Sequence, residues 1–314
     1  MSLVLNILTI VLPVFFVIGL GYLLRRTGMI SADFIFQTNR LVFYVCLPLL
    51  LFYKIGTADF SANFNGALVL GSVATIATGF CISYGYAALR RYPPASRGAF
   101  SQGSFRGNLA YIGLAIVLNA YGEVGFTKGG ILMGFLVPTL NLFAILALLL
   151  PHRANDGPRG AKFWLRQIAG NPLIIASFAG IGWSFFRLPI PVIAERSLHI
   201  ATGMTLPLAL IAIGGSFSLE RLRGDLVRAG FATGIKLVWL PLLATFFLTL
   251  LGVHGEDLGI GVLMAGTPAA TATYIMAHQM KGDAELAGAI VMMSTLLSAL
   301  TYSADLYLLH AFGL

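Results

Sequence analysis

Gly103–Ile112 reads GSFRGNLAYI and Gly266–Ile275 reads GTPAATATYI, so two stretches that look like copies stand in opposite halves of the chain. Both interrupt apolar sequence with residues that a plain membrane helix avoids, namely Gly, Pro, Thr and an Arg beside an Asn. In a membrane protein, paired interruptions at matching positions of two halves are the best sequence pointer to a transport site. The two stretches therefore predict a secondary transporter and the place of its site.

The composition of the chain indicates an integral membrane protein. Among its 314 residues, 58% are hydrophobic and only 10% are charged, and a soluble domain does not carry so little charge. Its apolar runs reach the roughly 20 residues that a helix needs to cross a bilayer. We expect ten membrane spans, near 3–24, 37–54, 66–89, 98–119, 126–150, 171–187, 197–217, 226–252, 258–280 and 285–312.

The net charge is +8, and the basic residues that cause it lie mostly on one side of the predicted membrane. The loops after odd-numbered spans, with the start of span 4, hold Arg25, Arg26, Arg40, Arg90, Arg91, Arg97, Arg106, Arg153, Arg159, Lys162, Arg166, Arg221, Arg223, Arg228 and Lys281. The other loops hold only Lys54, Lys128, Arg187 and Arg196. Because cytoplasmic loops carry an excess of Lys and Arg, both termini are expected outside the cytoplasm. The excess of basic residues is thus explained by membrane topology, and a nucleic-acid partner is not needed to explain it.

Further landmarks recur in the same order in the two halves. The first span and the sixth span share a set of landmarks: Pro13, Gly19, Gly21 and Tyr22 correspond to Pro172, Gly180, Gly182 and Trp183. The second and seventh spans share a Leu-Pro-Leu motif, at Leu47-Pro48-Leu49 and Leu206-Pro207-Leu208. With five spans in each half, the second half enters the membrane from the opposite side, which makes the repeat inverted. The alternative is coincidence among apolar segments. Spans 3 and 8 show no convincing match.

The residue types in the two interruptions indicate broken helices. Gly107 frees the backbone, and Asn108 can cap the following half-helix and offer its amide to a substrate. In span 9, Pro268 removes a donor and clashes with the preceding turn. Half-helix ends place unpaired N–H donors at mid-membrane, which suit an anion. The substrate-binding candidates are Arg106, Gly107, Asn108, Leu109, Asn141, Thr267, Pro268 and Ala269, with Gly266 as a structural hinge.

Some polar residues have more than one interpretation. Arg106 adjoins the first interruption and either attracts an anion or anchors the cytoplasmic side. Lys236 lies mid-span, where a lone Lys costs about 2.5–3.5 kcal/mol, so it should face the protein interior or a wet cavity. It is a possible ion or charge site, or an anchor to backbone carbonyls. Thr267 either bonds freed carbonyls or satisfies its own helix. Pro48 and Pro207 are expected to kink their helices.

Groups that carry protons, sodium or metals are scarce near the interruptions. Carboxylates are the usual carriers in membrane pumps, but none is expected near either interruption, and Asp305, late in span 10, is expected at the outer interface. This argues against a dedicated sodium/proton antiporter, although a sodium site of neutral oxygens stays open. Neither Cys46 nor Cys81 stands in a metal-like spacing. No His or carboxylate cluster suggests a membrane enzyme, and no cofactor or metal is expected.

The chain resembles the auxin efflux carrier family, which includes plant auxin exporters and bacterial proteins described as malonate transporters. The resemblance is carried by Pro13, Gly19, Asn39-Arg40, Leu47 to Leu50, Phe52, Arg106-Gly107-Asn108, Gly113, Tyr121-Gly122, Pro268 and Ser294 to Ser298. It implies ten helices in a five-plus-five repeat, a scaffold of spans 1, 2, 6 and 7, and a transport unit of spans 3–5 and 8–10. It also implies a homodimer, crossed broken helices 4 and 9 at Asn108 and Pro268, and Asn141 near the substrate.

The sequence departs from the family pattern at three places. Plant members have Pro where this chain has Gly107, and many members have Gly-x-Pro where it has Gly113-Leu114-Ala115. The connection from Pro151 to Asn171 is short. These features resemble a bacterial, organic-acid type of member in the inner membrane. The expected organisation is a first repeat over 1–150, a cytoplasmic linker over 151–170 and a second repeat over 171–314.

The function that follows is alternating-access transport of a small organic anion, a malonate-like or auxin-like mono- or dicarboxylate, around the crossing of helices 4 and 9. The expected partners are this anion, the lipid bilayer and a second copy of the chain. The alternative is a cation carrier of the sodium/proton antiporter type. A sodium flux without organic substrate would favour that alternative.

Overall fold

The computed structural model describes residues 3–152, 170–217 and 225–313, and within them the secondary structure is helical. These residues contain no β-strand beyond one isolated antiparallel bridge between Gly107 and Ala269. Most of the expected linker over 151–170 lies outside the described residues. Six basic residues that supported the topology lie outside them as well, namely Arg153, Arg159, Lys162, Arg166, Arg221 and Arg223.

Seven described helical stretches are long and apolar enough to cross a membrane. They are Leu3–Arg26, Ala32–Gly56, Gly66–Leu89, Leu109–Leu149, Val192–Gly215, Leu226–Leu250 and Ala284–Ala311, and Pro172–Phe185 is a shorter apolar helix. The expected spans near 98–119 and 126–150 run together because helix α7 (Leu114–Leu149) continues through Gly122, whose φ of 64° and ψ of −157° are not helical. The expected span near 258–280 is divided into two short helices.

The first half contains α1 (Leu3–Arg26), α2 (Ala32–Leu41), α3 (Leu47–Gly56), α4 (Phe60–Asn63), α5 (Gly66–Leu89), α6 (Pro94–Phe105) and α7. The π-helical segment η1 (Val42–Cys46) joins α2 to α3 immediately before Pro48. A proline lacks the N–H for an α-helical bond and its ring clashes with the preceding turn. The wider π turn therefore accommodates Pro48 without ending the helix.

The second half contains α9 (Pro172–Phe185), α10 (Val192–Gly203), α11 (Thr205–Gly215), α12 (Leu226–Gly234), α13 (Leu240–Leu250), α14 (Gly255–Ala265), α15 (Ala272–Gln279) and α16 (Ala284–Ala311). A π segment in this half, η5 (Ile235–Trp239), joins α12 to α13 and precedes Pro241 as η1 precedes Pro48. Lys236 lies in this segment.

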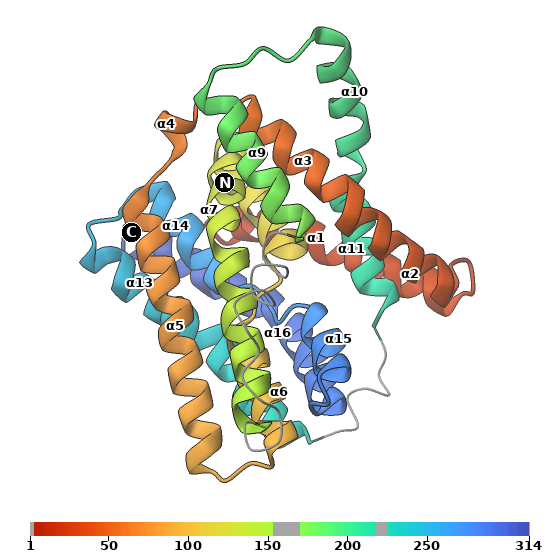
Figure 1. The fold of residues 1–314 in the computed structure, drawn as a ribbon, viewed down its shortest axis with the longest axis vertical. Helices are drawn as coiled ribbons and strands as arrows, with labels where there is room; N and C mark the ends of the chain where they lie inside the picture. Colours follow the sequence, from red (N-terminus) through yellow and green to blue (C-terminus); the bar gives the residue numbers. More distant parts are fainter. Residues whose placement is uncertain (1–2, 153–169, 218–224, 314) are drawn as a thin grey trace.

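Helices from the two halves pack in pairs. α1 makes its largest contact with α11, and α3 with α9; Figure 1 shows α3 and α9 side by side. Glycines allow the α1–α11 approach, because a Cβ on Gly21 would lie 2.3 Å from the carbonyl oxygen of Ile211. Small residues that let backbones approach closely are the usual means of packing helices in lipid.

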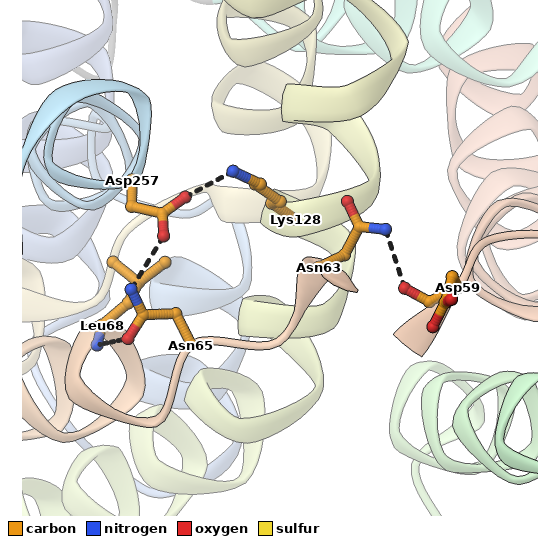
Figure 2. A network of polar contacts seen from close by, with 6 residues as sticks. All are labelled: Asp59, Asn63, Asn65, Leu68, Lys128 and Asp257. Atoms are coloured by element: carbon orange, nitrogen blue, oxygen red, sulfur yellow. Dashed lines mark hydrogen bonds and ion pairs between the residues drawn. The ribbon is translucent and has the colours of Figure 1, made fainter. Parts of the chain in front are cut away.

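A polar network joins the beginnings of α5 and α14 to the interior of α7 (Figure 2). Asn65 caps α5 by accepting from the backbone N–H of Leu68 at 3.1 Å, and its Nδ2 donates to Asp257 at 2.8 Å. Lys128 of α7 donates to the other oxygen of Asp257 at 2.7 Å. Asp257 in the first turn of α14 thus links α5, α7 and α14, while the neighbouring Asn63 bonds to the backbone oxygen of Asp59.

Candidate functional site

Two helix interruptions meet in the interior and bond to each other. The first interruption, Arg106–Asn108, separates α6 from the π segment η2 (Leu109–Gly113) that leads into α7. The second interruption, Gly266–Thr271, separates α14 from α15. The backbone N–H of Asn108 donates to the oxygen of Pro268 at 2.8 Å, and the N–H of Ala270 donates to the oxygen of Arg106 at 2.9 Å. Each interruption thereby satisfies main-chain groups that would be expensive to leave unpaired in a membrane.

The approach of the two interruptions depends on Gly107. A Cβ on Gly107 would lie 2.0 Å from the Oγ1 of Thr267, a distance that no side chain tolerates. Thr267 is fully buried, and its hydroxyl donates to the carbonyl of Met264 at 2.9 Å, within the end of its own helix. Gly107 is therefore required at this close contact between the two interruptions.

A cavity of about 590 Å³ opens beside the first interruption. Its polar lining residues are Asn39, Arg40, Tyr44, Arg106, Asn108, Tyr111, Asn141, Asn171, Thr271 and Gln279. Two of these side chains are guanidinium groups, and the lining includes no Asp or Glu. Guanidinium and amide groups are donors suited to carboxylates. The lining is thus electrostatically suited to a small anion.

Arg106 and Asn141 meet in this cavity although 35 positions separate them. One terminal nitrogen of Arg106 donates to the Oδ1 of Asn141 at 2.9 Å, and the other lies 3.0 Å from the sulfur of Met276. Asn108 caps η2 through a bond of 3.4 Å from the backbone N–H of Tyr111 to its Oδ1. Arg106 makes no ion pair with a carboxylate of the described residues, so its charge is available to the cavity.

The sequence-predicted candidates divide into two groups. Arg106, Gly107, Asn108, Leu109 and Asn141 line the cavity. The structure does not bring Thr267, Pro268 and Ala269 to the cavity: they are buried, and Pro268 and Ala269 pair with the first interruption through their main chain.

The structure places the predicted hinge residues away from that cavity. Pro207 lines a second cavity of about 410 Å³ together with Pro13 and Lys54. Pro48 lies after η1 and lines neither cavity. Gly266 caps the end of α14. Their role as hinges stays a prediction.

Several lining residues were missed by the sequence analysis as site residues, chiefly Arg40, Tyr44, Tyr111 and Gln279. For the lining residues of α2 and η1, the sequence did contain a pattern that could have identified them. Phe36, Asn39, Arg40 and Phe43 follow the spacing of one helical face, and all four line the cavity. A helix face with a charged and an amide side chain inside an apolar span could have been identified as cavity-lining.

The expected position of Asp305 was wrong, and with it the expectation that no carboxylate lies near an interruption. A Cβ on Gly266 would lie 2.8 Å from the Oδ2 of Asp305, and this oxygen is buried. The reason is the register of α16, in which Ser294, Ser298 and Tyr302 are fully buried on one face. Asp305 follows Tyr302 by three positions and so continues that inward face.

Lys236 faces the interior, as a mid-span lysine must. Its side chain is 1% exposed, and its ammonium donates to the carbonyl oxygen of Ala265, the last residue of α14. Within the described residues there is no group of three or more His, Cys, Asp or Glu that could hold a metal ion.

Apolar helices of spanning length define a multi-pass integral membrane protein, and the cavity with arginine and asparagine side chains beside the paired interruptions is its candidate binding site. A model of the family described as "Membrane transport protein" matches residues 6–157 and 159–304. The chain belongs to this family, the auxin efflux carrier family, and is a membrane transporter rather than an enzyme.

Three relatives match over nearly their whole length. A Rhizobium meliloti (strain 1021) protein named "Putative malonate transporter" is 27% identical over 96% of this chain and 95% of its own. An uncharacterized transporter of Methanothermobacter thermautotrophicus is 27% identical over 92% and 93% of the two chains. An uncharacterized transporter of Methanocaldococcus jannaschii is 21% identical over 93% and 95%.

Proposed function

We propose that this transporter carries a small organic anion, a mono- or dicarboxylate of malonate-like size, and that the cavity at the first interruption binds it. The observation that carries the proposal is the lining: two arginines, four asparagines and no carboxylate beside unwound main chain. The name of the Rhizobium meliloti relative, which includes malonate, agrees with this substrate class.

The chemistry of binding follows from the groups that face the cavity. Arg106 provides a planar fork of donors, which matches the two oxygens of a carboxylate. Arg40 gives a second positive charge from a different helix. Thr271 and Ala272 bring the N-terminal end of α15 to the same cavity, and such an end carries a partial positive charge. A dicarboxylate would engage Arg106 and Arg40 together.

Alternating access requires two bodies, and we assign them as the family resemblance implies. In this proposal ten spans form a five-plus-five inverted repeat. The crossed broken helices are helix 4, made of α6, η2 and the part of α7 before Gly122, and helix 9, made of α14 and α15. The pairing of α1 with α11 and of α3 with α9 supports one scaffold. The Asp257 network supports the other body, because it ties α5, α7 and α14 together (Figure 2).

The orientation and the assembly belong to the same proposal. With basic loops in the cytoplasm and both termini outside, Arg40, Asn171 and Gln279 lie at the cytoplasmic ends of their spans. The described cavity then opens to the cytoplasm. The transport unit would move against the scaffold in an elevator-like manner, within a homodimer in a bacterial inner membrane.

The test is uptake of labelled malonate by purified protein in proteoliposomes. Arg106→Ala and Asn108→Ala should each lower the initial rate by about tenfold or more, because a charge-assisted or a cavity-facing amide contact is lost. Arg106→Lys should recover part of the rate, since it keeps the charge but not the fork. Arg90→Ala is the matched control, because Arg90 is exposed outside the cavity. Normal uptake by both cavity variants would refute the site.

A cation carrier of the sodium/proton antiporter type remains the second candidate, and one observation favours it. Asp305 places a buried carboxylate oxygen without a hydrogen-bond partner beside the second interruption, where carboxylates carry ions in other membrane proteins. A sodium or proton flux in proteoliposomes that needs no organic anion would select this function over the first.

A further inference from the structure

Lys236 occupies a position where membrane transporters commonly hold an ion. Carbonyls in unwound segments and at half-helix C-terminal ends coordinate sodium or protons in transporters with broken helices. Here the end of α14 directs the carbonyl of Ala265 at the ammonium of Lys236. The C-terminal end of a helix carries a partial negative charge, so a cation at this carbonyl is stabilised.

A carboxylate with a buried oxygen lies at the same helix end. The Oδ2 of Asp305 is buried against Gly266 and has no hydrogen-bond partner, and the hydroxyl of the fully buried Tyr302 has none either. Asp305 interacts electrostatically with Lys236, but the two described side chains form no direct ion pair. The charges of Lys236 and Asp305 therefore balance around the second interruption without contact between them.

The space beside Lys236 is small, and most of its lining residues are apolar. A cavity of about 20 Å³ there includes Lys236, Ala265, Ser72 and Thr75 among its lining residues, and the hydroxyl of Ser72 is buried without a partner. Its volume is about that of one water molecule. Removal of the lysine side chain would enlarge it enough for a monovalent cation.

We propose that the Lys236 ammonium is a covalently attached substitute for a coupling cation at the second interruption, so that transport does not require sodium. This inference rests on the proposed function for its transport consequence. Its structural part is independent of the substrate: without Lys236, the Ala265 carbonyl and the Asp305 carboxylate form an anionic site open to a small monovalent cation.

The first experiment measures cation binding without any organic substrate. The melting temperature of purified protein is recorded in choline chloride and after replacement by sodium, lithium or methylammonium chloride. Wild-type protein should not respond, whereas Lys236→Ala should be stabilised by one or more of these cations. In Lys236→Ala/Asp305→Asn the response should vanish, because the anionic partner is gone. A Lys236→Ala protein that ignores all three cations, or an equal response of the double variant, would overturn the proposal.

The second experiment measures malonate uptake in the same salts. Wild-type rates should agree in sodium, potassium and choline, and sodium-dependent wild-type uptake would overturn the proposal even if no variant can be purified. Lys236→Ala should lose about tenfold or more in choline, since a buried charge is left without its partner. Methylammonium or sodium should restore a measurable part, and Lys236→Arg should stay active in choline. If wild-type protein moves no organic anion while Lys236→Ala still binds cations, the proposed function fails and the cation substitute stands.

Discussion

The first and the second interruption are paired in space but are supported in different ways. The first has three residues, resumes at once as a π segment capped by Asn108, and carries its own charge in Arg106. The second has six residues and no ionisable side chain, and it receives bonds from other helices. The ammonium of Lys236 reaches Ala265, and the hydroxyl of Ser294 accepts from the N–H of Ala269 at 3.0 Å.

This difference suggests that the first interruption recognises the substrate and that the second mainly stabilises the structure. The first interruption faces the cavity with a guanidinium and an amide, so its variants should change substrate binding. The part of the second interruption up to Ala269 is supported by bonds from η5 to Ala265 and between α16 and Ala269, so variants there should change stability before they change selectivity. Thr271, at the end of this interruption, lines the cavity instead. Substitutions in and around each interruption should therefore have different effects.

The largest effect is expected where the two interruptions touch. Gly107→Ala should lower the free energy of unfolding by about 3 kcal/mol, because the new Cβ overlaps the Oγ1 of Thr267. The backbone of Gly107 does not have a positive φ, so the clash alone is tested. Thermal unfolding in detergent is the measurement.

Two further variants control for this result. Gly107→Ala in a Thr267→Ala background should be less destabilised, because the overlapping oxygen is gone. Gly182→Ala, in a helix with nothing within 4 Å of its Cβ, should be neutral or slightly stabilising. Equal melting temperatures for Gly107→Ala and Gly182→Ala would mean that the close contact between Gly107 and Thr267 is absent.

An intermediate effect is expected behind the second interruption. Ser294→Ala leaves the buried N–H of Ala269 without its acceptor, which should cost about 2 kcal/mol of stability. Ser298→Ala is the control, since its hydroxyl is equally buried but bonds only within α16 to the oxygen of Thr295. Urea unfolding should separate the two variants while malonate affinity stays the same. A loss of affinity in Ser294→Ala without a loss of stability would reverse the assignment of roles.

A smaller effect is expected where α14 begins. Asp257→Asn removes the charge from the pair with Lys128, whose side chains are each about one-fifth exposed. The expected loss is about 1 kcal/mol, since partly exposed ion pairs contribute little. Asp225→Asn, in a more exposed pair with Arg228, should change melting less. If Asp225→Asn proves the more harmful, the network of Figure 2 does not hold α14 in place.

The smallest effect distinguishes two threonines, Thr271 at the end of the second interruption and Thr273 in the first turn of α15. Thr273→Val should be neutral or stabilising by up to about 1 kcal/mol, because its buried hydroxyl has no partner to lose. Thr271→Val should leave stability unchanged but lower malonate affinity, since Thr271 lines the cavity. Equal malonate affinities in the two variants would remove Thr271 from the site.

The location of the interruptions was accessible from the sequence because Gly, Pro and Asn act locally on the backbone. Gly107-Asn108 and Pro268 stand in the two non-helical segments. The direction of side chains beyond an interruption was not accessible, because helical periodicity is lost there. Thr267 and Ala269 are consequently buried and do not line the cavity that Thr271 lines.

The place of Asp305 was misjudged for a related reason. Its distance from the chain end suggested an interface, whereas its helical phase with Ser298 and Tyr302 decides its environment. The approach of α16 to Gly266 is a long-range contact that no local pattern encodes. The same holds for the meeting of Arg106 with Asn141, which depends on how two helices pack.

The antiparallel bridge between Gly107 and Ala269 is made by main-chain atoms alone. Side chains at the neighbouring positions can therefore be substituted without breaking the main-chain bonds between the two interruptions, as long as residue 107 remains glycine. Evolution could in this way change the transported substrate by substituting residues such as Arg106 or Thr271 while the main-chain contact stays the same. Protein engineering could use the same substitutions.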